Sequence, residues 1–143
     1  MSDSDSETGF ALDPRLAGDT RAVGDLALSS VLLMDDARFP WLILVPRRAG
    51  ASELTDLSDA DARSLMDEIR IATGVLSEIA RPDKINVGAL GNVVAQLHVH
   101  VVARFRSDPA WPGPVWGSGA RTPYPAHAAE ALLERLRAAF AAA

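Results

Sequence analysis

The sequence contains no cysteine, which excludes disulfide bonds, thiolate nucleophiles and every cysteine-ligated zinc or iron–sulfur site. Basic residues are fewer than acidic ones, 14 against 19. The formal net charge of −5 therefore gives no overall positive potential that would bind nucleic acid non-specifically. No apolar run approaches the roughly 20 residues of a membrane-spanning helix. The N-terminus, rich in Ser, Asp and Glu, lacks the basic start and apolar middle of a signal peptide. These absences predict a cytoplasmic protein with no nucleic-acid or membrane partner.

The composition that remains is that of an ordinary globular protein. Of the 143 residues, 48% are hydrophobic and 23% are charged, which excludes general disorder and fibrous repeats. A chain of this length forms one domain and buries enough surface to fold without cross-links. We expect residues 1–9, which are polar and carry no base, to be disordered, and residues 10–143 to form a single domain.

Four apolar runs are strand candidates. The runs 26–34 and 41–45 are separated by a short polar turn, which predicts an antiparallel hairpin. Because the second run, WLILV, is continuous rather than alternating, we expect both of its faces to be covered. Two further strands are expected at 84–89 and 96–105, with a glycine-containing loop between them.

Three segments carry helix signals. Asp13 followed by Pro14 predicts the start of a short helix that runs through Leu16. A capping-box-like start and apolar residues at helical spacing predict a long helix over Ser58–Ala80. A second amphipathic helix is expected over Ala126–Ala143.

The order of these elements, β-β-α-β-β-α, predicts an α+β fold in which an antiparallel sheet has its helices on one side. Residues 109–125 contain five prolines and should form an irregular loop.

The strand candidate at 96–105 begins with an alternating sequence, QLHVHV. Since successive side chains of a strand point to opposite faces, Gln96, His98 and His100 should share one face, and the apolar residues between them the other. The apolar set can pack under the helices. The polar set is then left facing outward, into a possible pocket.

This polar row has three interpretations from the residues alone. It is the solvated face of an amphipathic strand, or a His-x-His pair of metal ligands, or a site of nucleophilic catalysis by an imidazole whose neighbours fix its tautomer. The metal site needs a third ligand, yet there is no cysteine and the remaining histidine, His127, lies in the predicted C-terminal helix.

Residues 96–104, QLHVHVVAR, resemble the histidine triad (HIT) signature, His-φ-His-φ-His-φ-φ, with Gln96 in place of the first histidine. Three further segments resemble the same family in the same order: LLMDDARFPWLILVPRR, INVGALGN and the Trp111-Pro112 pair. The resemblance covers roughly residues 26–117. It implies a HIT-like antiparallel sheet of about five strands with two main helices.

The resemblance implies nucleotidyl transfer through a covalent histidine. His98 occupies the position of the nucleophile, which attacks the α-phosphorus of a nucleotide, and neutral imidazole suits this task near pH 7. The backbone carbonyl of Gln96 would orient His98, and His100 would hydrogen-bond the phosphoryl or bridging oxygen. The Gln96 amide can hold geometry but cannot relay a proton, because it does not titrate near neutrality.

The resemblance also implies substrate-binding roles for Asp35, Asn86, Gly91, Asn92, Val93 and Arg104. Asp35, or Asp36 in its place, would accept from the ribose hydroxyls, and the loop glycine would bring backbone N–H groups close to a phosphate. Each has a plainer structural alternative: a turn aspartate, a strand-end cap at Asn86, an ordinary loop, and a strand-end salt bridge at Arg104.

We therefore expect a HIT-type hydrolase or nucleotidyl transferase that acts on a purine nucleotide conjugate, a nucleoside phosphoramidate or a dinucleoside polyphosphate, without a cofactor or a metal. The alternatives are a nucleotide-binding module without useful catalysis and a purely structural dimerisation domain. A homodimer is expected, since HIT proteins commonly join two sheets across a two-fold axis and an uncovered sheet edge needs a partner. Trp111 and Trp116 are candidate interface anchors, or fold back on their own domain.

Overall fold

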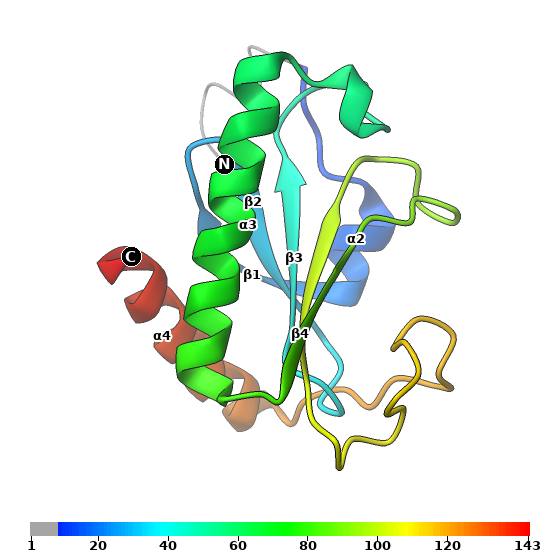
Figure 1. The fold of residues 1–143 in the computed structure, drawn as a ribbon, viewed down its shortest axis with the longest axis vertical. Helices are drawn as coiled ribbons and strands as arrows, with labels where there is room; N and C mark the ends of the chain where they lie inside the picture. Colours follow the sequence, from blue (N-terminus) through cyan, green and yellow to red (C-terminus); the bar gives the residue numbers. More distant parts are fainter. Residues whose placement is uncertain (1–8) are drawn as a thin grey trace.

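The structure is a computed structural model that describes residues 9–143, and its centre is a five-stranded antiparallel sheet of order β1-β2-β3-β5-β4 (Figure 1). The elements in chain order are α2 (Pro14–Asp19), β1 (Thr20–Asp25), β2 (Ser29–Met34), β3 (Trp41–Pro46), the short 3₁₀ helix η1 (Leu54–Asp56), α3 (Asp59–Ala80), β4 (Lys84–Gly88), β5 (Val99–Arg104) and α4 (Ala126–Ala142). The predicted α+β class is confirmed. The disorder expected for residues 1–9 falls, apart from Gly9, outside the described residues.

The helices α3 and α4 cover one face of the sheet (Figure 1). The Ser58 side chain accepts a hydrogen bond from the Asp61 amide and so caps α3, whereas Arg81, at φ 49°, ends it in the left-handed conformation. Apolar residues of both helices meet alternate residues of the strands, and together they form what we call the helix-side cluster, which includes Leu33, Leu42, Leu44, Leu65, Ala72, Leu76, Val101, Leu133 and Leu136.

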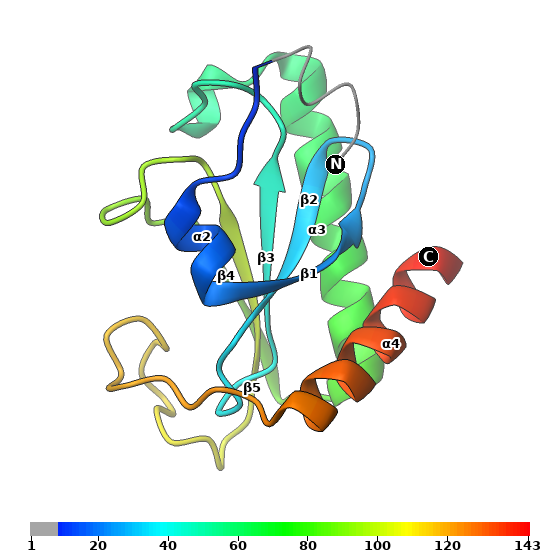
Figure 2. The ribbon, with the colours of Figure 1, turned by 180° about the vertical axis from the view of Figure 1, so that it is seen from behind.

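The other face of the sheet is covered by irregular segments. Figure 2 shows α2 and the chain before it on the side away from α3, with the loop of residues 105–125 nearby. Their apolar residues pack against the strand residues that point to this face. Together they form what we call the cavity-side cluster: Phe10, Leu16, Leu32, Phe39, Trp41, Ile43, Val45, Val102 and Val115. Every residue of β3 is buried, as its continuous apolar run predicts.

The strand β1 was not predicted, and β2, β4 and β5 are shorter than the predicted ranges 26–34, 84–89 and 96–105. The sequence pattern missed β1 because this edge strand buries only Val23 and shifts register between Ala22 and Gly24, so no alternation is visible. The predicted strand 96–105 begins only at Val99, since the Leu97 amide donates to the Ala51 carbonyl instead of joining the sheet ladder. Within residues 9–143, no helix has the length and apolarity to cross a membrane.

Candidate active site

A cavity of about 510 Å³ opens on the face of the sheet away from α3. Six parts of the chain line it: α2, the residues around the β2–β3 turn, Trp41 and Ile43 of β3, the loop 90–94, the loop 115–121, and the pair His98 and His100. His98 and His100 are 7% and 6% exposed, and their ring centroids lie 4.8 Å apart. These histidines are therefore groups of an enclosed site rather than the solvated face of a strand.

The tautomer of His98 follows from its hydrogen bond. Its Nδ1 lies 2.6 Å from the backbone carbonyl oxygen of Gln96, which can only accept. Nδ1 therefore carries a proton, and in the neutral ring Nε2 presents a lone pair. This is the arrangement that a nucleophilic imidazole needs.

His100 has the opposite tautomer. The indole Nε1–H of Trp41 donates to His100 Nδ1 at 3.0 Å, so Nδ1 is unprotonated and Nε2 carries the hydrogen. Burial, with a further contribution from the nearby His98, lowers the pKa of His100 to about 4. In their neutral forms the two rings thus present complementary groups, a lone pair on His98 and an N–H donor on His100.

Trp116 packs back on its own domain, which is one of the two roles considered for it. Its ring lies 5.4 Å from the ring of His100 and 6.5 Å from that of Trp41, measured between centroids. Gly88 allows this approach, since a Cβ there would lie 3.0 Å from the Trp116 ring. The loop 115–121 therefore closes one side of the cavity.

The loop that precedes the histidines lines the cavity as expected. Gly91, at φ 74°, needs a conformation that glycine adopts without strain. Gly91, Asn92 and Val93 all lie in the cavity lining, together with Leu90 and Val94. The backbone of this segment is therefore available to a ligand beside the histidines.

The two aspartates of the β2–β3 turn are placed differently. Asp35 does not line the cavity; its carboxylate accepts from the Tyr124 amide at 3.0 Å and lies 3.5 Å from Arg21. Asp36, the alternative, does line it and is paired with Arg38 at 2.8 Å. Burial opposes the ionisation of Asp36, but hydrogen bonds from Arg38 and the Thr122 amide outweigh it and hold its pKa below the ordinary value.

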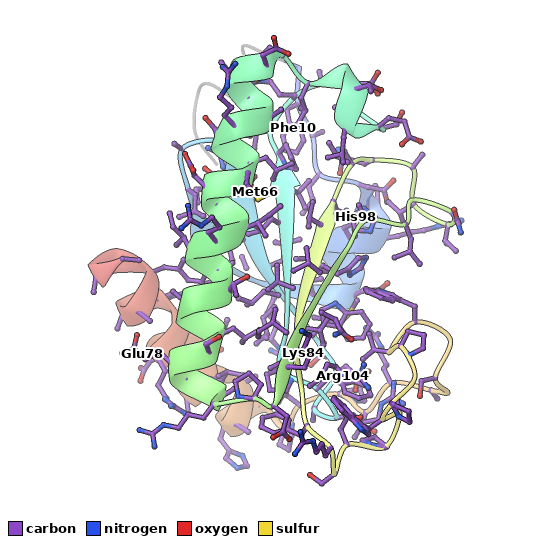
Figure 3. The ribbon with its side chains drawn as sticks, viewed as in Figure 1. Phe10, Met66, Glu78, Lys84, His98 and Arg104 are labelled. Atoms are coloured by element: carbon purple, nitrogen blue, oxygen red, sulfur yellow. The ribbon has the colours of Figure 1, made fainter. Side chains whose placement is uncertain are left out.

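Asn86 and Arg104 also lie outside the cavity lining. Arg104 is 1% exposed and forms a two-pronged ion pair with Asp108, at 2.8 and 3.0 Å, while its third nitrogen donates to Asn86. The guanidinium lowers the pKa of Asp108 to about 2. Figure 3 places Arg104 and His98 at opposite ends of the β5 segment. The salt-bridge alternative describes Arg104 correctly.

Gln96 contributes to the site in two separate ways. Its carbonyl orients His98, as the sequence predicted for the first position of the motif. Its side chain does not line the cavity and instead contacts the backbone at Ala11 and Asp13. The described residues contain no group of three or more His, Cys, Asp or Glu side chains able to hold a metal ion.

Sequence reasoning missed several residues of the cavity. Trp41 reads as an apolar strand residue, and its contact with His100 arises only because β3 pairs with β5 across 59 positions of sequence. Leu16 and Asp19 reach the cavity from α2, Arg38 from the β2–β3 turn and Arg121 from the loop 115–121. No local pattern marks these four residues as site residues.

Comparison with known proteins identifies the family. The HIT domain profile matches residues 16–107 of this chain. The fold is similar to a histidine triad protein from Bradyrhizobium japonicum, with a TM-score of 0.90 and 45% identity over 92% of this chain and 98% of that one. It is also similar to a HIT protein from Sinorhizobium meliloti, with a TM-score of 0.88 and 46% identity over 90% and 96% of the two chains.

Among curated proteins, the chain is similar to AP-4-A phosphorylase of Mycobacterium tuberculosis, with 40% identity over 73 residues. That match spans 47% of this chain and only 37% of the phosphorylase, so the likeness concerns a part of the larger protein. The profile match covers well over half of the sequence, in agreement with the two solved structures. The chain belongs to the HIT family.

Proposed function

We propose that the protein is a HIT-type hydrolase or nucleotidyl transferase that cleaves a nucleoside phosphoramidate or a dinucleoside polyphosphate. The observation that carries this proposal is the pair of complementary tautomers, a lone pair on His98 and an N–H on His100, inside one cavity. The similarity to AP-4-A phosphorylase supports a substrate of the dinucleoside polyphosphate class. We also propose a cytoplasmic location, with which a chain without cysteine is compatible.

The proposed reaction has two steps. Nε2 of His98 attacks the α-phosphorus, the bond from phosphorus to the leaving group breaks, and a nucleotidyl-histidine forms. Water, or another acceptor, then attacks the same phosphorus and releases His98. The Nε2–H of His100 hydrogen-bonds the oxygen that gains charge, and because its pKa is about 4 it acts near pH 7 as a neutral donor rather than as an imidazolium.

The remaining groups of the cavity would bind the nucleotide. The backbone at Gly91, Asn92 and Val93 is proposed to hold the phosphate, since these residues line the cavity next to the histidines. Asp36 is the better candidate than Asp35 for the ribose hydroxyls because it alone of the two faces the cavity, as an ionised acceptor. A purine base would lie against the apolar lining from Leu16 and Ile43.

The test is incubation with adenosine phosphoramidate and with a diadenosine polyphosphate, with release of AMP as the measurement. Inorganic phosphate added to the second reaction tests transfer, since an acceptor phosphate gives ADP. We expect His100→Ala to slow turnover by about 10²–10⁴-fold, as for a hydrogen-bonding or acid group. No turnover of either compound, combined with tight AMP binding, would contradict the enzyme.

The second candidate is a nucleotide-binding module with weak catalysis, and the observation that favours it is the glutamine at position 96. The variant Gln96→His separates the two candidates, because a large gain in rate would mean that the natural protein is catalytically compromised. A purely structural domain predicts that no nucleotide raises the melting temperature. A true ligand at 100 times its Kd should add about 2.7 kcal/mol to the free energy of unfolding.

We also propose a homodimer. The strand β4 forms one edge of the sheet, and Val87 on it is 49% exposed, so this edge has unpaired backbone groups next to apolar surface. Sedimentation equilibrium at micromolar concentration tests this, and a mass of one 15.2 kDa chain would contradict it. In a dimer, Trp111→Ala should weaken association or nucleotide affinity.

A further inference from the structure

The side chain of Gln96 ties together two distant parts of the chain. Its Oε1 accepts from the Asp13 amide at 2.8 Å, and its Nε2 donates to the Ala11 carbonyl at 2.8 Å, across more than 80 positions of sequence. The amide thus pairs with the backbone through both of its polar atoms, as a neighbouring strand would. We call this pair of hydrogen bonds the Gln96 clamp.

The clamp holds a segment that forms one wall of the cavity. Residues 10–19 run across the cavity-side face of the sheet, where Phe10 and Leu16 are each 5% exposed. Leu16 and Asp19, further along this segment, line the cavity itself. The clamp therefore acts at the point where this wall begins.

The wall has little stability of its own. The helix α2 has only six residues, and a helix this short is not stable in isolation. It starts at Asp13, whose side chain caps the Arg15 amide while its backbone amide binds Gln96. A second tie near the start of α2, from Arg15 to the Val93 carbonyl, is exposed and longer, at 3.3 Å, and at the other end of the helix the Asp19 carbonyl accepts from the Asp35 amide at 3.0 Å.

Gln96 also connects this wall to the nucleophile. Its carbonyl accepts from His98 Nδ1 at 2.6 Å, and its side chain binds the backbone of Ala11 and Asp13. One residue therefore fixes the position of the nucleophile relative to the start of the wall. The HIT profile match begins at residue 16, after both backbone partners of the clamp. The two backbone partners of the clamp thus lie outside the region matched to the family, whereas Gln96 lies inside it.

We propose that Gln96 is a positioning residue that holds residues 10–19 as the nucleotide-contacting wall, and so sets affinity rather than the rate of phosphoryl transfer. This inference rests on the proposed function. The removal of the side chain leaves the residue-96 carbonyl in place, so His98 keeps its tautomer. The loss should therefore fall on KM and leave kcat and its pH profile largely unchanged.

The experiment compares Gln96→Ala, Gln96→Glu and Arg15→Ala in the full chain, with the substrate that the wild type turns over and with AMP binding by calorimetry. Gln96→Ala should raise KM and the AMP Kd by about tenfold, with kcat within about threefold, because one partly buried and one exposed hydrogen bond are lost. Gln96→Glu keeps the acceptor for Asp13 and should lie between the wild type and Gln96→Ala. Arg15→Ala should stay within about twofold of the wild type.

Hydrogen exchange of the Asp13 amide, followed by NMR, tests the clamp without any substrate. Exchange should accelerate at least about tenfold in Gln96→Ala and remain slow in Gln96→Glu. If the alanine variant fails to fold, the Gln96→Glu variant alone is compared with the wild type. A fall in kcat at unchanged KM, unchanged Asp13 exchange, or an equal rise of KM in Arg15→Ala would overturn the inference. If the wild type neither binds nor turns over nucleotide, the proposed function is wrong, and the Asp13 exchange alone decides on the clamp.

Discussion

The two faces of the sheet are both well buried, yet they are covered by different means. On one face, α3 and α4 pack apolar side chains against the strands in the helix-side cluster. On the other, irregular segments cover the sheet and are held by hydrogen bonds from a few polar side chains: Asp36, Arg38, Gln96, Arg104 and Asp108.

This difference explains where the site lies. Regular helices fill the surface they cover, whereas loops held at a few points can leave a cavity with backbone groups and buried histidines along its walls. The comparison predicts that changes on the helix side alter stability alone, and that changes on the cavity side alter activity or the order of the loops.

The largest effect is expected for His98→Ala. Loss of the nucleophile should reduce turnover by at least about 10⁴-fold, with a melting temperature close to that of the wild type, because the apolar residues under β5 are unchanged. AMP release and thermal unfolding measure the two quantities. His127→Ala, which removes an exposed histidine in α4, is the matched control and should keep full activity. Retention of more than a tenth of the activity by His98→Ala would exclude the covalent mechanism.

Asp108→Asn tests the polar support of the cavity face. Removal of one partner leaves the Arg104 charge buried without its ion pair, so we expect a loss of about 3–5 kcal/mol in the free energy of unfolding. Urea denaturation measures it. Asp61→Asn breaks the exposed pair with Arg48 and should cost at most about 1 kcal/mol. Equal costs in the two variants would show that burial of the Arg104–Asp108 pair is unimportant.

Leu136→Ala makes the matching test on the helix side. Leu136 is fully buried in α4, so the cavity left by its truncation should lower the free energy of unfolding by about 2–5 kcal/mol. The activity of the folded fraction should equal that of the wild type, since α4 lies on the opposite face. Glu134→Ala, one exposed residue of the same helix, should be nearly neutral. A changed KM in Leu136→Ala would mean that the two faces are coupled.

Acid should destabilise the protein through His100. The unfolded imidazole takes up its proton near pH 6.5, whereas the folded one does so only near pH 4, so the stability is full above pH 6.5 and is lost progressively as the pH falls from 6.5 to 4. Between pH 7 and pH 4.5 this group alone should lower the free energy of unfolding by about 2–3 kcal/mol. Urea denaturation at the two pH values measures the change, and His100→Gln should lose less. Equal losses in the wild type and in His100→Gln would mean that a group other than His100 takes up the proton.

Trp41→Phe should have the smallest effect. The ring is largely kept, but the donor that fixes the His100 tautomer is lost, and kcat should fall by about tenfold, as expected for one hydrogen bond. The ¹⁵N shifts of His100 should then report a mixture of tautomers. Trp116→Phe, which removes an indole N–H with no hydrogen-bond partner in the described part of the chain, should have a smaller effect. Unchanged ¹⁵N shifts in Trp41→Phe would contradict the tautomer assignment.

The helix side was largely predictable from the sequence, because its signals are local. The apolar spacing that predicts Ser58–Ala80 corresponds to α3 over Asp59–Ala80, and the continuous run 41–45 corresponds to the fully buried β3. The strand β1 was missed because a single buried residue makes no pattern.

The cavity side was predictable only in part, because long-range contacts shape it. The alternation in the sequence predicted that His98 and His100 share one face, and the glycine-containing loop was predicted to lie beside them; both line the cavity. Which of Asp35 and Asp36 faces the cavity depends on the hydrogen bonds that the turn accepts from the amides of Thr122 and Tyr124. Whether Arg104 is free to bind a ligand depends on its ion pair with Asp108. Neither contact has a local sequence signal.

The aromatic packing around His100 also gives the molecule an internal optical probe. Two of its three tryptophans, Trp41 and Trp116, lie within 6 Å of the His100 ring, measured between centroids, whereas Trp111 lies over the Arg104 guanidinium. Both of the first two indoles line the cavity, so a ligand that enters changes the surroundings of both rings. The intrinsic fluorescence of the unlabelled protein should therefore change with occupancy of this cavity.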